Sequence, residues 1–454
     1  MSTEHPWGEQ TERAVANFPI SGQPLPWEVL RALISLKGGA AIVNGKRHVI
    51  PKDVAHAIHD VAGELIAEPH PEWFPVDVFQ TGSGTSTNMN VNEVIASLAS
   101  ARLGKPVHPN DHVNASHSSN DIFPSAIRLA ASQLIVRRVV PALESVEIEL
   151  RRLAKEHATT VKAGRTHLMD AVPITFGDEA AGWARSIRLG IERLVGTLSR
   201  LGELPLGGTA TGSGLNAPRG FASDVIAKLA GDLQLPLSEA VDHFEAQSAQ
   251  DSLVEVSGAV KVVALALHKL AGDLRLLGSG PATGLREIEL PALQAGSSIM
   301  PGKVNPVVPE MVQQVAAQVV GNDAAITFAA TLSTLQLNTA MPVMARNLIE
   351  SLKLVTAASG QLASACLSGL TVNADVMRRY AESSPAIVTV LNPLIGYEAG
   401  ARIAKRAISE GRTIRELVLD EGLLDVAQLD EALDVAAMAG VRRRKGSDGA
   451  AVEG

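Results

Sequence analysis

The sequence predicts a mainly all-α protein built around long, closely packed helices. Aromatic residues make up only 3% of the 454 residues, so Ala, Leu and Val carry the core. Small aliphatic side chains suit close-packed helices better than a β-sandwich. Apolar residues also recur at three- and four-residue steps over long segments, which is the spacing of one helical face.

Five segments show this helical spacing. In the third, Leu253, Val256, Val260 and Val263 begin a series that continues to Leu274. The helices are therefore expected over residues 125–159, 173–201, 251–279, 305–334 and 344–370.

Several of these segments are apolar on more than one face. Residues 262–266 read Val-Val-Ala-Leu-Ala and leave little polar surface. A helix that is apolar all round must be buried on all sides. One chain of this length would not bury five such helices, so we expect a homo-oligomer built around a shared bundle.

Polar, glycine-rich stretches separate the helices. They are rich in Ser, Thr, Asn and His, and loops of this length in a compact helical protein tend to be functional. The stretches are residues 81–92, 107–121, 163–170, 207–217 and 296–306. After about residue 372 the predicted segments become shorter, with a Pro/Gly break at 391–400. Residues from about 442 lack apolar periodicity and are expected to form a disordered tail.

Charge and cysteine content limit the partners and the location. The formal net charge is −8, with both signs mixed and no basic stripe, so nucleic acid is not an expected partner. Cys366 is the only cysteine, which leaves no disulfide framework and no Cys-based zinc site. The N-terminus lacks the apolar core of a signal peptide, and no apolar run reaches the length of a membrane span. The expected location is the cytoplasm.

The stretch GSSIMPGKVNP, residues 296–306, has the outline of a phosphate-binding loop but not its spacing. That motif needs four residues between its glycines and a Ser or Thr after the lysine. Here five residues separate Gly296 from Gly302, and Val304 follows Lys303. A surface loop without function is the alternative. Two hydroxyls, a cation and an amide in one compact loop instead indicate an anion site with a candidate nucleophile or base.

The histidines give two further candidates. His108, His112 and His117 are close in sequence, but the proline and asparagines among them favour a loop, whereas a metal-binding HxxxH pair needs a helix. A metal is therefore not favoured there. His167, in GRTHL, would by itself more often be a structural histidine. It gains interest beside Ser297, because proton abstraction next to a carboxylate needs a base on one side and charge stabilisation on the other.

Motifs along nearly the whole chain resemble, in the same order, those of the class II fumarases in the fumarase/aspartase superfamily. Besides GSSIMPGKVNP, which resembles the superfamily signature loop, they include VFQTGSGTSTNMNVNEVI, HPNDHVN, SSNDIFP, GRTHLMDAVP, GGTATGSGLNAP and MARNLIESLKL. The resemblance implies a three-domain, nearly all-helical subunit that assembles as a homotetramer with a twenty-helix core. The implied domains are an N-terminal lyase domain at 1–117, a central helical bundle at 118–372 and a small C-terminal domain at 373–454.

The resemblance also implies that three subunits build each active site. Each contributes one group of substrate-binding or catalytic residues. The first group is Ser83, Thr85, Ser118, Ser119 and Asn120; the second is Thr166 and His167; the third is Ser297, Ser298, Lys303 and Asn305, followed by Glu310.

The implied reaction is the reversible hydration of fumarate to (S)-malate, a step of the tricarboxylic acid cycle. Ser297 acts as the base beside one carboxylate of malate, and Lys303 and Asn305 stabilise the aci-carboxylate that forms. His167 assists the leaving hydroxide through a water, and Glu310 orients His167. The serine needs a lowered pKa, and the loop must close over the substrate with glycine hinges. Neither a metal nor an organic cofactor is implied.

A second dicarboxylate site is implied near the HPND segment. It maps onto Lys105, His108, Pro109, Asn110 and Asp111. The alternative for these residues is a polar loop near the site entrance.

Two alternative functions remain. One is an aspartate ammonia-lyase or another C4-dicarboxylate lyase of the superfamily, and the other is a non-catalytic relative. Aspartate ammonia-lyases usually have Ala at Gly302, Gln at His167 and GAG at 82–84, so all three positions favour a fumarase. The intact set of candidate catalytic residues argues against a non-catalytic relative.

The chain also departs from the usual family pattern. His117 and Asp178 each stand where a Gln is usual, and Ala115 replaces a bulkier residue. His117 places a titratable group beside Ser118, which is expected to alter pH dependence or substrate tolerance.

Overall fold

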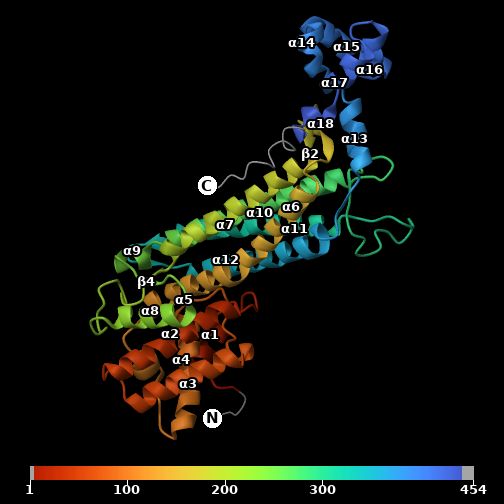
Figure 1. The fold of residues 1–454 in the computed structure, drawn as a ribbon. Coiled ribbons are helices and arrows are strands. Elements are labelled where there is room, and N and C mark those ends of the chain that lie inside the picture. The colour runs from red at the N-terminus through yellow and green to blue at the C-terminus, as the bar shows by residue number, and fades with distance from the viewer. Residues whose placement is uncertain (1–4, 442–454) are drawn as a thin grey trace. The chain divides into compact units, whose positions relative to one another are not determined.

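The computed structural model describes residues 5–441, which fall into two compact units. Unit 1 is drawn from residues 1–142, 190–265 and 314–358, and unit 2 from residues 143–189, 266–313 and 359–454. The described chain is mainly helical, which confirms the predicted fold class (Figure 1). The predicted tail from about 442 lies outside the described residues, and the predicted three-domain division stays a prediction.

All five predicted long helices are present, with ends that shift by a few residues. The first continues through a π-helical segment, η3 (Ile135–Val139), which joins α5 to α6. The last ends in a second π-helical segment, η4 (Leu362–Leu367). The helices are α5 (Ser119–Leu134), α6 (Val140–Glu156), α7 (Phe176–Leu201), α10 (Asp251–Leu277), α11 (Val307–Ala330) and α12 (Met341–Gln361).

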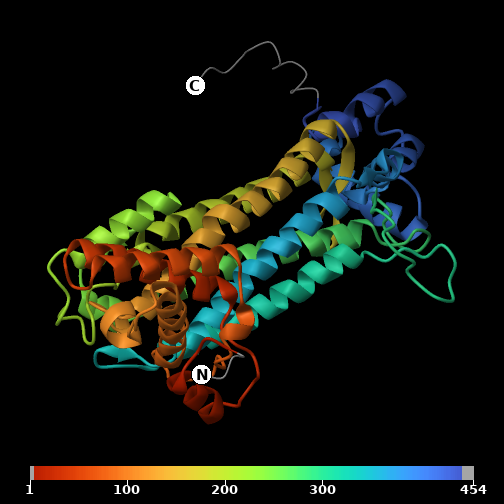
Figure 2. The ribbon, with the colours of Figure 1, turned by 90° about the horizontal axis from the view of Figure 1, so that it is seen from below.

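Contacts between these helices occur within each unit. In unit 1, α7 and α10 are joined by an ion pair between Arg200 and Glu255, and Lys261 of α10 bonds Asp323 of α11 at 2.6 Å. In unit 2, the Trp183 indole of α7 donates to Asp273 of α10 at 2.9 Å. Both ribbon views show α7 and α10 running alongside each other (Figures 1 and 2).

Helix α2 (Trp27–Lys46) is the centre of the remaining part of unit 1. It begins directly after Pro26, whose fixed φ suits the first turn of a helix. It packs against α3 (Lys52–Ala67), α5 and α8 (Phe221–Leu233). Gly38 permits the close approach to α3, because an added Cβ would lie 2.9 Å from the Cβ of Ala62.

Apart from the largely buried helix α4 (Thr85–Leu103), the other elements of unit 1 are short. Two small sheets pair β3 with β4 in parallel and β6 with β7 in antiparallel fashion. The remaining elements are α1 (Glu9–Asn17), η1 (Pro71–Trp73), α4 (Thr85–Leu103), η2 (Pro109–Val113), β3 (Glu203–Leu204), β4 (Ser238–Glu239), α9 (His243–Ser248), β6 (Ser333–Thr334) and β7 (Leu337–Asn338).

Unit 2 contains an antiparallel hairpin that the sequence analysis missed. Strands β1 (Val161–Thr166) and β2 (Met169–Thr175) form it, so the stretch 163–170 is not a loop between helices. The helix predicted to begin at 173 begins instead at Phe176, directly after β2. A second small sheet pairs β5 (Ile288–Glu289) with β8 (Thr371–Val372).

The C-terminal part of unit 2 is a small helical cluster. Its core includes Leu391, Ile403, Leu417 and Leu429, all fully buried. Gly396, with φ 84°, separates α14 from α15 within the predicted Pro/Gly break. The elements are α13 (Ala374–Ser383), η5 (Pro385–Leu391), α14 (Asn392–Ile395), α15 (Tyr397–Glu410), α16 (Ile414–Asp420), α17 (Val426–Ala432) and α18 (Val435–Met438).

Several apolar side chains of the long helices stay exposed in the single chain. Phe328 is 69% exposed, and Val195 and Leu265 are each 48% exposed. None of the described helices is both long and apolar enough to cross a membrane.

Candidate active site

Three hydroxyl groups of unit 1 form a chain of hydrogen bonds, here called the hydroxyl cluster (Ser83, Thr85 and Ser119). The Thr85 hydroxyl lies 2.9 Å from that of Ser83 and 2.8 Å from that of Ser119. Thr85 is the first residue of α4 and Ser119 the first of α5. Two helix N-termini therefore meet at the cluster, and the free N–H groups and positive dipole ends there favour an anion.

A buried carboxylate holds the start of α5 in place. Asp121 accepts from the N–H of Ser118 at 2.8 Å and forms a capping box with it. Its other oxygen accepts from the N–H groups of Gly207 and Thr209 at 3.0 and 2.9 Å. Burial raises the pKa of Asp121 to about 7, and these N–H groups act in the opposite direction. Sequence reasoning missed this residue, although the Ser-x-x-Asp spacing was a capping signal.

The glycine-rich stretch 207–217 is thereby joined to the cluster. The side-chain amide of Asn120 also donates to the carbonyl of Ala210 at 2.9 Å. Asn120 thus fixes this stretch against α5 in the single chain. The polar stretches 81–92, 107–121 and 207–217 thus come together, all within unit 1.

His117 lies beside Ser118 as predicted, but it is buried. Its ring is stacked on that of Phe221, with centroids 6.4 Å apart, and its Nε2 lies 3.2 Å from Nζ of Lys37. Lys37 is the second residue of the site region that sequence reasoning missed. A lone lysine within the apolar run of residues 29–43 was the available signal.

The predicted second site is an exposed segment of unit 1. Residues 109–113 form a π-helix, which corrects the predicted loop. Nδ1 of His108 lies 3.2 Å from the Asp111 carboxylate. The Lys105 ammonium pairs with Asp53, and that hydrogen bond lowers the pKa of Asp53. A dicarboxylate at this place would have to compete with Asp53 for the lysine.

Thr166 and His167 lie at the tip of the β1–β2 hairpin in unit 2. Thr166 pairs with Met169, which leaves His167 and Leu168 as a two-residue turn. Their φ values are 57° and 61°, which is the conformation that favours Asn-Gly in such turns. A His-Leu pair is strained there, and strain of this kind concentrates at functional sites. The His167 side chain is exposed.

Buried charges hold the base of this hairpin. Arg165 donates to Glu287 at 2.9 Å, and Lys162 lies 3.2 Å from the same carboxylate. Lys162 also donates to Glu179 at 2.6 Å. Glu287 is fully buried and directly precedes β5, so the hairpin is fixed to the segment that leads into residues 296–306.

The loop of residues 296–306 closes on itself through its backbone. The N–H of Gly296 donates to the carbonyl of Lys303 at 2.9 Å, and the Asn305 side chain donates to the carbonyl of Gly296 at 2.8 Å. Within the loop, the Ser297 hydroxyl oxygen accepts from the N–H groups of Ile299 at 3.2 Å and Met300 at 3.1 Å. Ser298 and Lys303 are exposed.

Glu310 follows this loop in the first turn of α11. Its carboxylate lies 3.7 Å from the Arg275 guanidinium of α10. Within the described residues, no hydrogen bond or ion pair joins His167 to Glu310 or to Ser297. Their predicted partnership stays a prediction that one chain does not test.

The comparisons with known proteins identify the class. The family described as "Lyase" matches residues 1–321, and the family described as "Fumarase C C-terminus" matches residues 387–440. Among solved structures, a class II fumarase of Schistosoma mansoni superposes with a TM-score of 0.94 at 35% identity, covering 97% of this chain and 96% of that chain. The fold and the site define a lyase.

Curated relatives give the particular family. Fumarate hydratase class II of Mycobacterium tuberculosis is 54% identical over 95% of this chain and 92% of its own length. The class II enzyme of Corynebacterium glutamicum is 52% identical over 96% and 93%. The chain belongs to the class II fumarate hydratases.

Proposed function

We propose that this chain catalyses the reversible hydration of fumarate to (S)-malate with Ser297 as the base. The observation that carries the proposal is the pair of backbone N–H groups directed at the Ser297 hydroxyl oxygen. Hydrogen bonds to the charged form of a group favour that form, so two such donors stabilise an alkoxide.

The roles proposed for Lys303, Asn305 and His167 follow from where negative charge develops during the reaction. When Ser297 removes the proton beside one carboxylate of malate, that carboxylate gains negative charge. Lys303 supplies a nearby cation on the same loop, and Asn305 contributes an amide once it leaves the Gly296 carbonyl. Preorganised donors of this kind make the largest contribution to transition-state stabilisation in many enzymes. His167 assists the hydroxide that leaves from the adjacent carbon, with Glu310 as its orienting partner.

The hydroxyl cluster supplies the other half of the substrate site. Ser83, Thr85 and Ser119, with Ser118 and Asn120, offer neutral donors at two converging helix N-termini. These suit a carboxylate without requiring a cation at that end. Thr166, next to His167, and Ser298, next to Ser297, complete the contacts of the substrate.

We further propose that the active enzyme is a cytoplasmic homotetramer in which three subunits contribute to each site. The exposed apolar side chains of the long helices support an oligomer, because a shared helical bundle would cover them. The absence of a bond from His167 to Ser297 or Glu310 within the described part of one chain agrees with sites completed by other subunits. The single cysteine, Cys366, is a buried free thiol, as expected in a reducing compartment.

The test measures the appearance of fumarate from malate by its ultraviolet absorbance. Ser297→Ala is expected to lower kcat by about a thousandfold, since it removes the base. Ser298→Ala is the matched control, because its neighbouring hydroxyl receives none of these N–H bonds; we expect mainly a rise in KM. A Ser297→Ala enzyme that keeps most of its kcat would contradict the proposal.

Assays of the same purified protein with aspartate and malate distinguish the two alternative functions. Release of ammonia from aspartate without turnover of malate would show an ammonia-lyase. No turnover of either compound would show a non-catalytic relative.

A further inference from the structure

Lys37 lies in the interior of unit 1 without a carboxylate partner. Its side chain is fully buried, and among residues 5–441 Lys37 forms no ion pair with an Asp or Glu side chain. The two groups within reach of its ammonium are the amide oxygen of Asn114, at 3.3 Å, and Nε2 of His117, at 3.2 Å. A buried ammonium with only neutral partners is costly, so its presence calls for a reason.

The contact between Lys37 and His117 requires one of the two nitrogens to donate a proton and the other to accept it. An ammonium has donors only, so when Lys37 is charged His117 must accept through Nε2 and be neutral. Two adjacent cations in one buried site are unfavourable. Burial and the proximity of Lys37 both lower the pKa of His117, and burial lowers the pKa of Lys37 to about 7, with Asp121 acting in the opposite direction. The pair thus holds at most one positive charge.

The pair is linked to the helices that carry the hydroxyl cluster by two routes. His117 directly precedes Ser118 and Ser119. The Asn114 oxygen also accepts from Asn88 and Asn92 of α4, at 3.0 and 3.2 Å, and Asn88 follows Thr85 by one helical turn. The Lys37–His117 pair is therefore linked to the first turns of α4 and α5, the two helices whose starts carry hydroxyls of the proposed site.

Other charged groups around the pair are few. Asp121 of α5 is the nearby carboxylate; backbone N–H groups hold it, and burial raises its pKa to about 7, so it titrates in the same range as Lys37. On the α3 side, Nδ1 of His59 lies 3.2 Å from the carbonyl of Gly38. The ring of Phe221 from α8 and the asparagines of α4 are uncharged. Nothing in this surrounding replaces the charge of Lys37.

We propose that Lys37 and His117 act as positioning residues that share one proton next to the hydroxyl cluster, and that this buried positive charge favours binding of the dicarboxylate. The inference rests on the proposed function and adds a charge to a part of the site that otherwise offers only neutral donors. Substrate affinity then depends on pH. It is greatest when the pair is protonated, and it falls as pH rises through the neutral range and the charge is lost.

The first experiment measures kcat and KM for malate and fumarate at several pH values. In the wild-type enzyme KM is expected to rise by about tenfold from about pH 6 to about pH 9, as a unit charge near a dianion is removed. Lys37→Met is expected to have a high KM already at about pH 6 and a smaller rise toward about pH 9, the rise that Asp121 alone causes, with kcat changed by less than about threefold. In His117→Gln the amide oxygen still accepts a hydrogen bond from Lys37 but cannot take up its proton. The positive charge then stays on Lys37, so the rise in KM of this variant should occur at a higher pH than in the wild type.

Lys46→Met is the matched control, because Lys46 is on the same helix and exposed. It should keep the wild-type KM and pH profile. A pH-independent wild-type KM, or Lys37→Met with a wild-type profile, would overturn the inference while leaving the proposed function intact. A purely structural role would lower the amount of folded enzyme, not remove the pH dependence of KM.

A binding measurement separates this inference from the proposed function. Calorimetric titration with succinate, a dicarboxylate without the reacting double bond or hydroxyl, needs no turnover. Affinity that weakens with rising pH in the wild type, and that in Lys37→Met is weak already at low pH and less dependent on pH, supports the charged pair even if malate is not converted. Wild-type protein that binds succinate equally at all pH values, or does not bind it, contradicts the inference.

Discussion

The guanidinium of Arg165 donates to the carboxylate of Glu287 at 2.9 Å, although 122 residues separate the two in sequence. Both belong to unit 2. Glu287 also lies 3.2 Å from Lys162 and is fully buried, so one carboxylate serves two cations. Replacing it by glutamine leaves Arg165 without a carboxylate partner among the described residues and leaves Lys162 with Glu179 alone.

Glu287→Gln is therefore expected to lower the free energy of unfolding by about 3–5 kcal/mol, the usual effect of breaking a buried ion pair from one side. Glu289→Gln is the control. Glu289 lies two residues along and pairs with Arg286 at 3.3 Å, but both side chains are about half exposed, so we expect a loss of no more than about 1 kcal/mol. Denaturant unfolding followed by circular dichroism measures both. Equal losses would show that the Glu287 network does not hold the hairpin.

Gly296 and Gly302 allow a comparison within one loop. A Cβ on Gly296 would lie 2.4 Å from the carbonyl oxygen of Lys303, so the backbone must move. Gly302 has φ 79° but open space around its Cα. Gly296→Ala is expected to lower kcat by about a hundredfold, since displacement of a reacting group by about 1 Å has effects of this size.

Gly302→Ala should reduce kcat by less than about tenfold, because it introduces only the moderate strain of a left-handed residue. Steady-state kinetics with malate measures both variants. If Gly302→Ala were the more damaging, hinge motion at Gly302 rather than the closed shape at Gly296 would limit the reaction.

The buried lysine also predicts how stability depends on pH. Burial lowers the pKa of Lys37 from 10.5 to about 7, so between these values the unfolded chain binds a proton that the folded chain does not. The contribution of Lys37 to the free energy of unfolding therefore rises as pH increases, by about 1.4 kcal/mol per pH unit in this range. Lys37→Met should be more stable than wild type near pH 7, and the difference should shrink toward pH 10.

Urea unfolding at several pH values tests this. Lys46→Met, on the exposed side of the same helix, should follow the wild-type dependence. A stability difference between Lys37→Met and wild type that stays constant from pH 7 to pH 10 would contradict the prediction.

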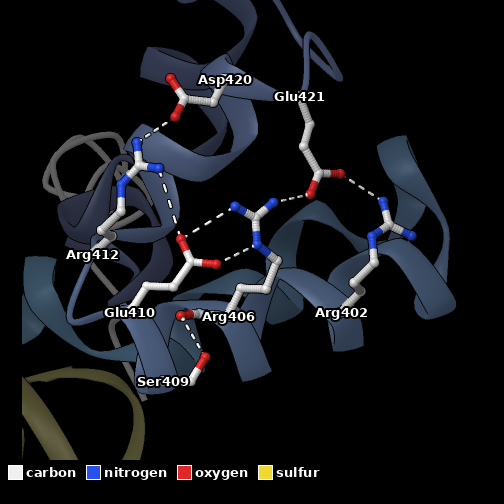
Figure 3. A network of polar contacts seen from close by, with 7 residues as sticks. All are labelled: Arg402, Arg406, Ser409, Glu410, Arg412, Asp420 and Glu421. Carbon is white, nitrogen blue, oxygen red and sulfur yellow. Dashed lines mark hydrogen bonds and ion pairs between the residues drawn. The ribbon is translucent and has the colours of Figure 1, made fainter.

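Arg406 lies at the centre of a surface ion-pair network in the C-terminal cluster (Figure 3). It donates to Glu410 at 2.6 Å and to Glu421 at 2.5 Å, while Arg402 and Arg412 bind the outer sides of these carboxylates. These two carboxylates raise the pKa of Arg406. Arg406→Gln is expected to lower the melting temperature slightly, because exposed pairs contribute little individually but more as a network.

Salt provides the check on that prediction. Arg415, which pairs only with Asp430 among the described residues, is the control, and Arg415→Gln should lower the melting temperature less. Both differences should shrink in high salt, since screening weakens exposed ion pairs. A difference for Arg406→Gln that is unaffected by salt would indicate lost packing instead.

The sequence predicted the long helices well because their apolar spacing is a local signal. It missed the β1–β2 hairpin because the two-residue turn is His-Leu, not the Asn-Gly that marks such turns. The start of α7 was placed too early for the same reason, since β2 lies directly before it. The π-helical segments have no distinct sequence pattern.

For the site, sequence and resemblance located the hydroxyls and the serine loop, but not what holds them. Asp121 and Lys37 act through partners that are distant along the chain, Thr209 in one case and His117 in the other. Such partners depend on how helices pack, which a single sequence does not show. The joining of His167, Ser297 and Glu310 in one site stays a prediction, because no hydrogen bond or ion pair joins His167 to the other two within the described residues.

The β1–β2 hairpin restricts how this chain can diverge. Its turn contains only two residues, and Gly164 lies within an irregularity of the register between Ala163 and Arg165. Inserting or deleting one residue would turn every later side chain of the strand to the opposite face. His167 would then leave the tip, and Arg165 would lose Glu287. Exposed positions within 161–175 can therefore be substituted one at a time, whereas a change in length would need a compensating bulge to keep the histidine at the tip.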